Sequence, residues 1–305
     1  MKRVVVTGMA GLSPIGQDWQ TVEKNLRERN SGVVYMQDWE KYPELLTKLG
    51  APVKDFVLPK HYNRKKTRSM GRIAKLATRA TELALEDAGL LNDPFIQSGE
   101  MGVAYGSSAG SPDAIGEFGE MLLNQKSGNL NATSYIRMMG HTCPVNIGVF
   151  FGLQGRVIPT SSACTSGSQG IGYAYEAIKF GKQTAMVAGG AEELCATEAA
   201  VFDTLFATST KNDTPTTTPS PFDKDRDGLV IGEGAGTLVL EELEHALARG
   251  ATIYAEVLGF ATNSDGQHVT RPNKDTMQKA IEEALLDAQL APSAIGYVNA
   301  HGTAT

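Results

Sequence analysis

The sequence predicts an α/β protein, and two observations lead to that prediction. Many of the 33 glycines come directly after short β-branched runs, which is typical of strands that end in tight turns and lead into helices. Several of these runs are apolar almost throughout, as strands buried on both faces must be. At 305 residues the chain is long enough for about two domains with a sizeable core.

Strands and helices are expected in turn along the chain. Residues 1–6 resemble the start of a signal peptide, but the glycines and the proline that follow interrupt the apolar segment too early, so we predict a first strand and its turn there. The polar, proline-rich residues 212–221 predict a surface loop. The predicted strands are residues 4–6, 101–105, 156–159, 185–188, 236–240, 253–257 and 295–299, and the predicted helices are residues 67–88, 167–180 and 276–288.

Two parts of the chain resemble each other. Residues 84–90, at the end of one predicted helix, are repeated as residues 284–290, and a predicted strand follows each. The upstream strands at residues 4–6 and 253–257 extend the match. We interpret the similarity as a duplicated αβ unit, with chance as the alternative. It divides the chain into residues 1–250 and residues 251–305, and the second copy is expected to be cut off.

Composition and charge exclude several classes of protein. The net charge of −6 and the pI near 5.5 argue against general binding to nucleic acid or to a membrane surface. The longest apolar runs, about four to six residues, are far short of the ~20 that a transmembrane helix needs. Cys143, Cys164 and Cys195 are an odd number without CxxC spacing, so neither disulfides nor a zinc site are expected. Reduced thiols indicate a cytoplasmic protein.

Cys164 is the strongest candidate for a nucleophile. It lies among small residues in a turn that follows an apolar run and precedes an amphipathic helix. At a helix N-terminus the helix dipole and the free N–H groups lower the pKa of a thiol and favour the thiolate. The alternative is a small buried side chain, since free cysteines are among the most buried residues.

His301 comes directly after the last predicted strand. In α/β sheets, ligand-contacting residues gather at the carboxyl ends of strands. In the duplication His301 corresponds to Gly106 and Ser107, so the two turns are expected to face one cleft. A hydrogen-bonded structural histidine is the alternative.

Two other patterns imitate functional motifs. Residues 106–110 fit the nucleophile-elbow pattern around Ser108, but Pro112 is expected to interrupt the elbow before a helix begins, which argues against a serine hydrolase. The aspartates of residues 223–228 imitate the start of a calcium loop. However, Glu233 falls one position short of the closing place, and a predicted strand follows instead of a helix.

Basic residues recur every three or four positions around the first predicted helix, which places them on one stripe of its surface. A solvated helix face is one interpretation, and a docking site for an anionic protein is the other. The residues of this basic stripe are Arg64, Arg68, Arg72, Lys75 and Arg79.

At the Cys164 turn, at His301 and in the segments between them, the chain closely resembles the elongating β-ketoacyl-acyl-carrier-protein synthases, the condensing enzymes of fatty acid synthesis. The resemblance implies the thiolase fold, in which two similar halves are each built on a mixed five-stranded sheet around shared central helices, normally in a homodimer. It also implies that residues 223–228 are a family loop. The matching segments are residues 4–8, 13–16, 159–168, 188–193, 209–213, 222–228 and 299–303.

The resemblance implies a role for each candidate site residue. Cys164 would accept the acyl group, and His301 would be the first of two active-site histidines. The other implied roles are phosphopantetheine binding by Thr303 and Thr305, lining of the acyl pocket by Ala109 and Phe202, docking of the acyl carrier protein by Lys65 and Arg68, and gating of the site by residues 265–270 with His268.

The implied activity is that of a 3-oxoacyl-[acyl-carrier-protein] synthase, which condenses an acyl-cysteine with malonyl-acyl-carrier protein and loses CO₂. Its substrates arrive on phosphopantetheine, so no metal or other cofactor is expected. Family members continue beyond the position of Thr305, and that part carries the second histidine, so this chain is expected to be truncated and inactive alone. A hydrolase acting through Ser108 and a non-catalytic partner subunit are the alternatives; such subunits usually lack the nucleophilic cysteine, so Cys164 argues against the second.

Overall fold

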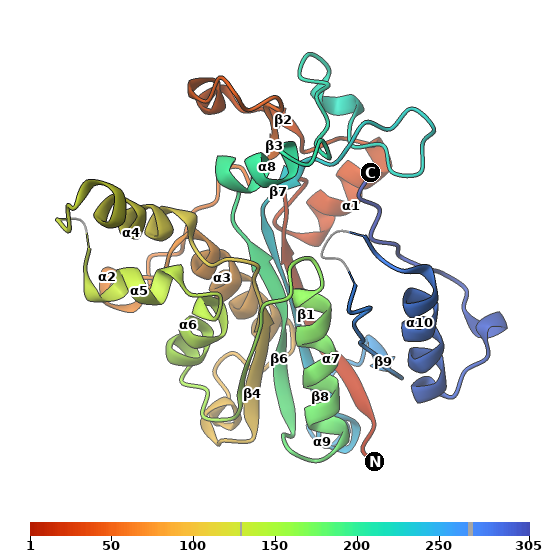
Figure 1. The fold of residues 1–305 in the computed structure, drawn as a ribbon. Helices are drawn as coiled ribbons and strands as arrows, with labels where there is room; N and C mark the ends of the chain where they lie inside the picture. Colours follow the sequence, from red (N-terminus) through yellow and green to blue (C-terminus); the bar gives the residue numbers. More distant parts are fainter. Residues whose placement is uncertain (129, 268–270) are drawn as a thin grey trace.

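The computed structural model describes residues 1–128, 130–267 and 271–305, with a mixed sheet at its centre (Figure 1). In spatial order its strands are β5 (Val157–Thr160), β4 (Met101–Gly106), β6 (Ala185–Glu192), β8 (Gly234–Glu242), β1 (Val4–Leu12) and β9 (Ala255–Val257). β4 runs parallel to β5 and β6, whereas β8 is antiparallel to β6 and β1, and β9 is antiparallel to β1. The predicted α/β class is confirmed, and six of the seven predicted strands belong to this sheet.

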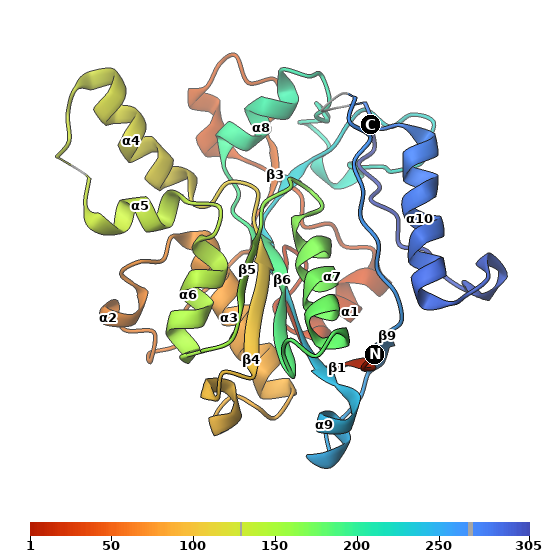
Figure 2. The same cartoon turned by 60° about the horizontal axis from the view of Figure 1, so that its bottom comes forward.

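Helices cover both faces of the sheet (Figure 2). Val103 and Val187 pack in a core with α3 (Arg72–Asp87) and α6 (Thr142–Phe151). Their neighbours Ala104 and Met186 pack in a second core with α7 (Ser166–Lys179). Successive side chains of a strand point to opposite faces. All four are fully buried, which explains why these strands are apolar without alternation.

β1 is longer than predicted, because Gly8 does not end it. The strand continues through Gly8 to Leu12, with a shift in register after Val6. A Cβ atom on Gly8 would lie only 2.3 Å from the carbonyl oxygen of Ala84. Glycine is therefore needed because α3 crosses the strand at close range, not because the chain turns there.

The same close contact recurs in the second copy of the predicted repeat. A Cβ atom on Gly259 would lie 2.5 Å from the carbonyl oxygen of Ala284, which belongs to α10 (Lys274–Ala288). Gly259 follows β9 as Gly8 follows the first residues of β1, and Ala284 corresponds to Ala84. The strand-to-helix part of the predicted duplication is thus confirmed.

In each copy a carboxylate near the end of the helix accepts a hydrogen bond from the strand segment. Asp87, at the end of α3, accepts a hydrogen bond of 2.9 Å from the backbone N–H of Met9. Asp287, in the last turn of α10, accepts one of 3.0 Å from the backbone N–H of Phe260. Met9 and Phe260 each directly follow the glycine of their copy, so each carboxylate ties its helix to the strand segment at the closest point.

The prediction of a strand at residues 295–299 is wrong. This segment follows the 3-10 helix η4 (Pro292–Ala294) without regular structure, and Tyr297 and Val298 are 78% and 74% exposed. No strand in the described part of the chain pairs with it, and an unpaired extended segment gains no backbone hydrogen bonds from folding. The two copies therefore differ downstream of their helices.

The prediction of one helix over residues 67–88 is also wrong, because α2 (Arg64–Thr67) and α3 are separate helices. Gly71 caps the N-terminus of α3, and a Cβ atom on it would lie 2.4 Å from Ser111 Oγ. A residue without a side chain is needed at this break. By contrast, α7 and α10 match their predicted ranges to within two residues.

The remaining elements surround the sheet. A second, small sheet has the order β2 (Val34–Tyr35), β3 (Leu49–Ala51), β7 (Ile231–Gly232). None of the helices that the structure describes is long and apolar enough to cross a membrane. The other helices are α1 (Trp19–Glu28), α4 (Pro112–Asn124), α5 (Ala132–Met138), α8 (Ala196–Asp203) and α9 (Leu243–Ala248), with 3-10 helices η1 (Gln37–Lys41), η2 (Pro94–Gln97) and η3 (Pro215–Thr217).

Candidate active site

A cavity of about 990 Å³ lies at the carboxyl ends of β4 and β6. The turns that follow parallel strands meet at this edge of the sheet, which is the usual place for a binding site in α/β proteins. Candidate site residues from four parts of the chain line the cavity together: Ala109, Cys164, Phe202, His301 and Thr303.

Cys164 is held outward by a strained turn between β5 and α7. Ala163, directly before it, has a left-handed backbone with φ 51°, which is unfavourable for a residue other than glycine. Ser166 Oγ stabilises this turn, because it accepts a hydrogen bond of 2.8 Å from the N–H of Ser162 and donates one of 2.7 Å to the carbonyl of Ala163. As a result the Cys164 side chain is exposed on the cavity.

The interpretation of Cys164 as a small buried side chain is therefore wrong, and it applies to Cys143 instead. Cys143, on α6, is fully buried. Burial, reinforced by the charges of Glu192 and Glu193, raises the pKa of the Cys143 thiol well above its usual range. A thiol is a poor nucleophile while it is protonated. Cys164, by contrast, lies two residues before the start of α7, with its side chain exposed on the cavity.

His301 reaches the cavity from the last residues of the chain. Ala304 is buried and left-handed, with φ 64°, so the chain bends sharply within this segment. The hydroxyl groups of Thr303 and Thr305 are 2.7 Å apart. Ser107 and His301 line the same cavity, which confirms that the two corresponding turns face one cleft.

Ser108 lacks the partners of a hydrolase nucleophile. Its N–H donates a 2.7 Å hydrogen bond to Glu192 Oε2, and its carbonyl accepts a 3.3 Å hydrogen bond from Ser161 Oγ. The Ser108 side chain also interacts with the Glu192 carboxylate. Among the described residues, no histidine is hydrogen-bonded to Ser108 Oγ to act as its base. The expected interruption at Pro112 is wrong, because α4 begins there; proline suits the first turn of a helix, whose N–H groups have no partner within the helix.

Comparison with protein families distinguishes a condensing enzyme with Cys164 from a hydrolase acting through Ser108. The chain matches "Beta-ketoacyl synthase, N-terminal domain" over residues 1–246 and "Beta-ketoacyl synthase, C-terminal domain" over residues 254–305. The chain belongs to the beta-ketoacyl synthase family. The resemblance inferred from its motifs is confirmed.

Individual relatives of this chain agree with the family assignment. It is 39% identical over 308 residues to the 3-oxoacyl-[acyl-carrier-protein] synthase 2 of Vibrio harveyi, covering all of this chain and 74% of that relative. The crystal structure of a beta-ketoacyl synthase from Burkholderia phymatum STM815 is 57% identical, with a TM-score of 0.98 over all of this chain and 75% of that one. A third similar structure is described as a type II PKS acyl-carrier protein in complex with its ketosynthase bound to the hexaketide. It is 29% identical to this chain, with a TM-score of 0.83, and the match covers 100% of this chain and 74% of that one. The fold is the thiolase-like fold of ketosynthases.

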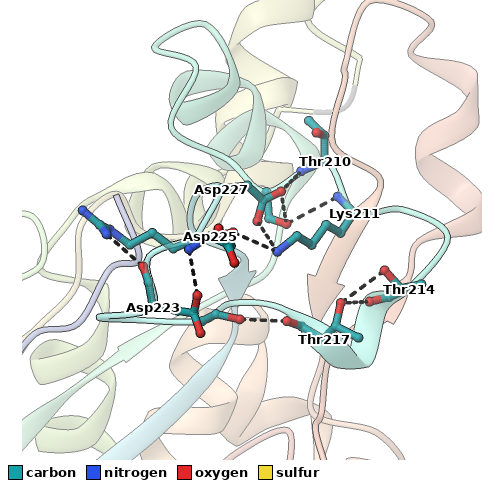
Figure 3. A network of polar contacts seen from close by, with 10 residues as sticks. Thr210, Lys211, Thr214, Thr217, Asp223, Asp225 and Asp227 are labelled. Carbon is teal, nitrogen blue, oxygen red and sulfur yellow. Dashed lines mark hydrogen bonds and ion pairs between the residues drawn. The ribbon is translucent and has the colours of Figure 1, made fainter.

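The aspartates of residues 223–228 hold a loop of the synthase together (Figure 3). Asp223 Oδ1 accepts a 2.7 Å hydrogen bond from the N–H of Asp225. Asp227 accepts hydrogen bonds from Ser209 Oγ and the N–H of Thr210, and forms an ion pair of 3.4 Å with Lys211. These carboxylates stabilise the loop itself. No group of His, Cys, Asp or Glu in the described residues is arranged to hold a metal ion.

This loop also supports the segment that carries His301. Arg226 Nε donates a 3.3 Å hydrogen bond to the carbonyl of Thr305. A Cβ atom on Gly302 would contact the side chain of Pro221 at 3.4 Å, so the two segments pack closely. A loop that imitates a calcium site in sequence thus contributes to the position of the segment that brings His301 to the cavity.

The basic stripe divides into paired and unpaired residues. Arg72 forms two hydrogen bonds with the carboxylate of Glu233, at 2.8 and 2.6 Å, and Arg79 pairs with Glu82. Lys65 and Arg68 are exposed, and within the described part of the chain they form no ion pair. The expectation of one continuous helical stripe is therefore wrong.

The candidate residue His268 lies outside the described residues. The predicted gating loop is described only up to residue 267, where Asp265 Oδ1 accepts a hydrogen bond of 3.1 Å from the N–H of Gln267. Asp265 Oδ2 also accepts a hydrogen bond of 3.2 Å from the N–H of Asn273, the cap residue of α10.

Sequence reasoning missed the acidic residues of the cavity. Glu192, at the end of β6, and Glu198, in the first turn of α8, both line it. Burial raises the pKa of Glu192, although its hydrogen bonds with Ser108 oppose that effect. The one signal in the sequence is that two glutamates directly follow an apolar strand, but only the fold shows which of them faces the cavity.

Proposed function

We propose that this synthase extends an acyl chain held on Cys164, as a 3-oxoacyl-[acyl-carrier-protein] synthase does. The observation that carries the proposal is the outward, exposed thiol of Cys164 on a cavity that it shares with His301. A cavity of about 990 Å³ has room for an acyl chain together with the end of a pantetheine arm.

The first step transfers the acyl group. The Cys164 thiolate attacks the carbonyl carbon of an acyl-carrier thioester, and backbone N–H groups stabilise the negative oxygen of the tetrahedral intermediate. The bond between that carbon and the pantetheine sulfur then breaks. Pantetheine leaves as the thiol after taking up a proton, and the acyl group remains on Cys164. In this step Thr303 and Thr305 hold the pantetheine arm, while Ala109 and Phe202 line the acyl chain.

The second step forms the new carbon–carbon bond. The malonyl group of a second carrier protein loses CO₂, and the electron pair of the broken bond forms an enolate whose oxygen accepts a hydrogen bond from His301. The enolate carbon attacks the acyl carbon, the bond to the Cys164 sulfur breaks, and the 3-oxoacyl chain leaves on the carrier protein. Neither step uses a metal or a bound cofactor, because the substrates carry their own phosphopantetheine.

The test is the mass of the protein after incubation with an acyl-[acyl-carrier protein]. We expect one acyl adduct, located on Cys164 by peptide mapping and absent from Cys164→Ala. Cys195→Ala is the matched control and should acylate normally, because Cys195 does not line the cavity. An adduct on Cys143, Cys195 or Ser108, or acylation that persists in Cys164→Ala, would contradict the proposal.

Lys65 and Arg68 are proposed to attract the acidic carrier protein. Their support is that both are exposed and unpaired in the described structure, whereas Arg72 and Arg79 are held by carboxylates. Exposed charges of this kind mainly speed up encounter and contribute about 0.2–1 kcal/mol each. The double variant Lys65→Glu, Arg68→Glu should slow acylation from the carrier protein at low salt and flatten its salt dependence.

Reaction of Cys164 with a small thiol reagent should be unchanged in that variant. A matched control is the pair Lys24→Glu, Lys182→Glu, which reverses two exposed lysines elsewhere on the chain. If the control slows carrier-dependent acylation as much, or if the double variant leaves it unchanged, the docking assignment is wrong.

The proposal also covers three further properties: the oligomeric state, the cellular location and the boundary between the two halves. We propose a homodimer, supported by β5, whose outer edge is unpaired in the sheet and whose Val157 is 48% exposed. A cytoplasmic location is supported by three unpaired cysteines. The thiolase-like halves are proposed to divide between residues 250 and 251.

A further inference from the structure

One wall of the active-site cavity is a face of α8. Val201 and Phe202 come three and four positions after Glu198, which places both on the same side of the helix as Glu198, and all three line the cavity. Ala109 lines it as well. Along this helix face an apolar surface suited to a hydrocarbon chain is interrupted by one carboxyl group.

The carboxyl group of Glu198 has no partner in the described structure. Its Oε1 atom is buried and forms no hydrogen bond. The two neighbouring glutamates each have a protein partner. Glu192 Oε2 accepts a hydrogen bond from the N–H of Ser108, although its Oε1 is also buried without a partner, and Glu193 accepts one of 2.9 Å from the N–H of Ile73. A buried polar atom without a partner destabilises the folded protein, so its presence in a binding cavity points to a partner that arrives with the ligand.

Glu198 carries a proton at neutral pH. Burial, and after it the charges of Glu192 and Glu193, raise its pKa to about 8. A protonated carboxyl group has an O–H that donates a hydrogen bond, whereas an ionised one only accepts. The wall formed by α8 therefore presents a hydrogen-bond donor to the cavity.

An alkyl chain and an oxygen-bearing chain would meet this donor differently. A saturated chain that fills the cavity covers the O–H and offers it no hydrogen-bond acceptor. A ketone or hydroxyl oxygen on the chain can accept the hydrogen bond instead. Sites built around a buried polar group discriminate against ligands that leave it unpaired.

We propose that Glu198 makes this synthase select acyl chains that carry a ketone or hydroxyl oxygen in the part of the chain that lies against α8. The inference rests on the proposed function, because it needs the acyl chain of Cys164 to occupy the cavity. In this role Glu198 is a specificity-determining residue and takes no part in bond making.

The experiment measures the rate of Cys164 acylation by pantetheine thioesters, which do not depend on docking of the carrier protein. The probes are decanoyl pantetheine and analogues of the same length with a single ketone at the fifth to ninth carbon in turn. For the wild type at pH 7 we expect one or two adjacent ketone positions to react about 5- to 10-fold faster than the saturated chain, which is the effect of one net hydrogen bond.

Three variants separate recognition from structural damage. Glu198→Leu should abolish the preference by losing rate with the ketone chain and gaining rate with the saturated chain. Glu198→Gln should keep most of the preference, because its amide also donates. Thr197→Leu places the same side chain on an exposed neighbouring position of α8 and should keep the full preference.

The outcomes distinguish this inference from the proposed function. If no thioester acylates Cys164, the proposed function fails. If Cys164 is acylated but all ketone positions react like the saturated chain, or Glu198→Leu keeps the wild-type ratio, only the role of Glu198 is overturned. A preference for a chain that ends in an ammonium group would also overturn it, because that preference requires an ionised carboxylate.

Discussion

The two copies of the αβ repeat are built on the same contacts and differ in their surroundings. In the first copy α3 crosses β1 at Gly8, Asp87 binds the next N–H, and ten residues of α3 are buried. In the second copy α10 crosses the chain at Gly259 and Asp287 binds the next N–H, yet no residue of α10 is buried. The glycine and the carboxylate thus specify the local contact, whereas the amount of buried surface depends on which other elements pack against the helix.

The difference also concerns the active site. The first copy leads into β4, which is paired on both sides and ends at Gly106, and the next residue, Ser107, lines the cavity. The second copy leads into residues 295–299, which no strand of the described chain pairs with, and then to His301, which lines the same cavity. The position of His301 therefore relies on contacts of the aspartate loop, such as that of Arg226 with Thr305.

Matched truncations of the two helices should show the largest difference. Leu85 is fully buried, so Leu85→Ala should lower the free energy of unfolding by about 2–5 kcal/mol. Leu285 occupies the same place in the repeat but is only half-buried, and Leu285→Ala should cost about 1 kcal/mol or less. Urea unfolding followed by circular dichroism measures both. Equal losses would mean that the two helices are equally packed in solution.

Substitution of the two glycines should give a smaller contrast. An added Cβ at Gly8 meets both the carbonyl of Ala84 and Ala88 in a helix fixed by the core, so Gly8→Ala should destabilise by about 1–3 kcal/mol. At Gly259 the clash is similar, but α10 has no buried residue and can shift away, so Gly259→Ala should cost less than about 1 kcal/mol. Thermal melts of the two variants at one pH provide the comparison. A larger loss for Gly259→Ala would contradict this explanation.

The smallest effect is expected from the carboxylate of the second copy. Burial works against ionisation of Asp287, but hydrogen bonds from Lys179, the N–H of Phe260 and Tyr175 outweigh it and hold the pKa below its ordinary value. A lowered pKa stabilises the folded state above the ordinary value near 3.8, and this contribution is lost as the pH falls through the lowered pKa.

Asp287→Asn should therefore be less stable than the wild type at pH 7, and the difference should shrink as the pH falls from about 4. Because the Asp287 side chain is 32% exposed and solvent screens its charge, we expect a difference below about 1 kcal/mol. Unfolding free energies at a series of pH values measure it, with Asp213→Asn as a control at an exposed aspartate. A difference that stays constant down to pH 3 would show that charge is not its cause.

Patterns within a few residues predicted much of this protein correctly. Apolar runs identified β4 and β6, because strands buried on both faces are apolar without alternation. They also identified β5 and β8, although these strands are only partly buried. The small residues around Cys164 and the helix that follows identified a turn whose thiol is exposed on the cavity. The repeat of residues 84–90 at 284–290 indicated two similar αβ units, but not the close contacts at Gly8 and Gly259 that the structure shows.

Only the tertiary structure decided the features that depend on a distant partner. Residues 295–299 have the composition of a strand, but no neighbouring strand pairs with their backbone. Arg72 and Lys65 look alike in sequence, yet Glu233 holds only Arg72. Glu198 is one of several glutamates after β6, and only the docking of α8 against the cavity buries its carboxyl group without a partner. Local sequence determines which conformation a segment favours, whereas pairing, burial and charge compensation are set by residues far along the chain that only the fold brings into contact.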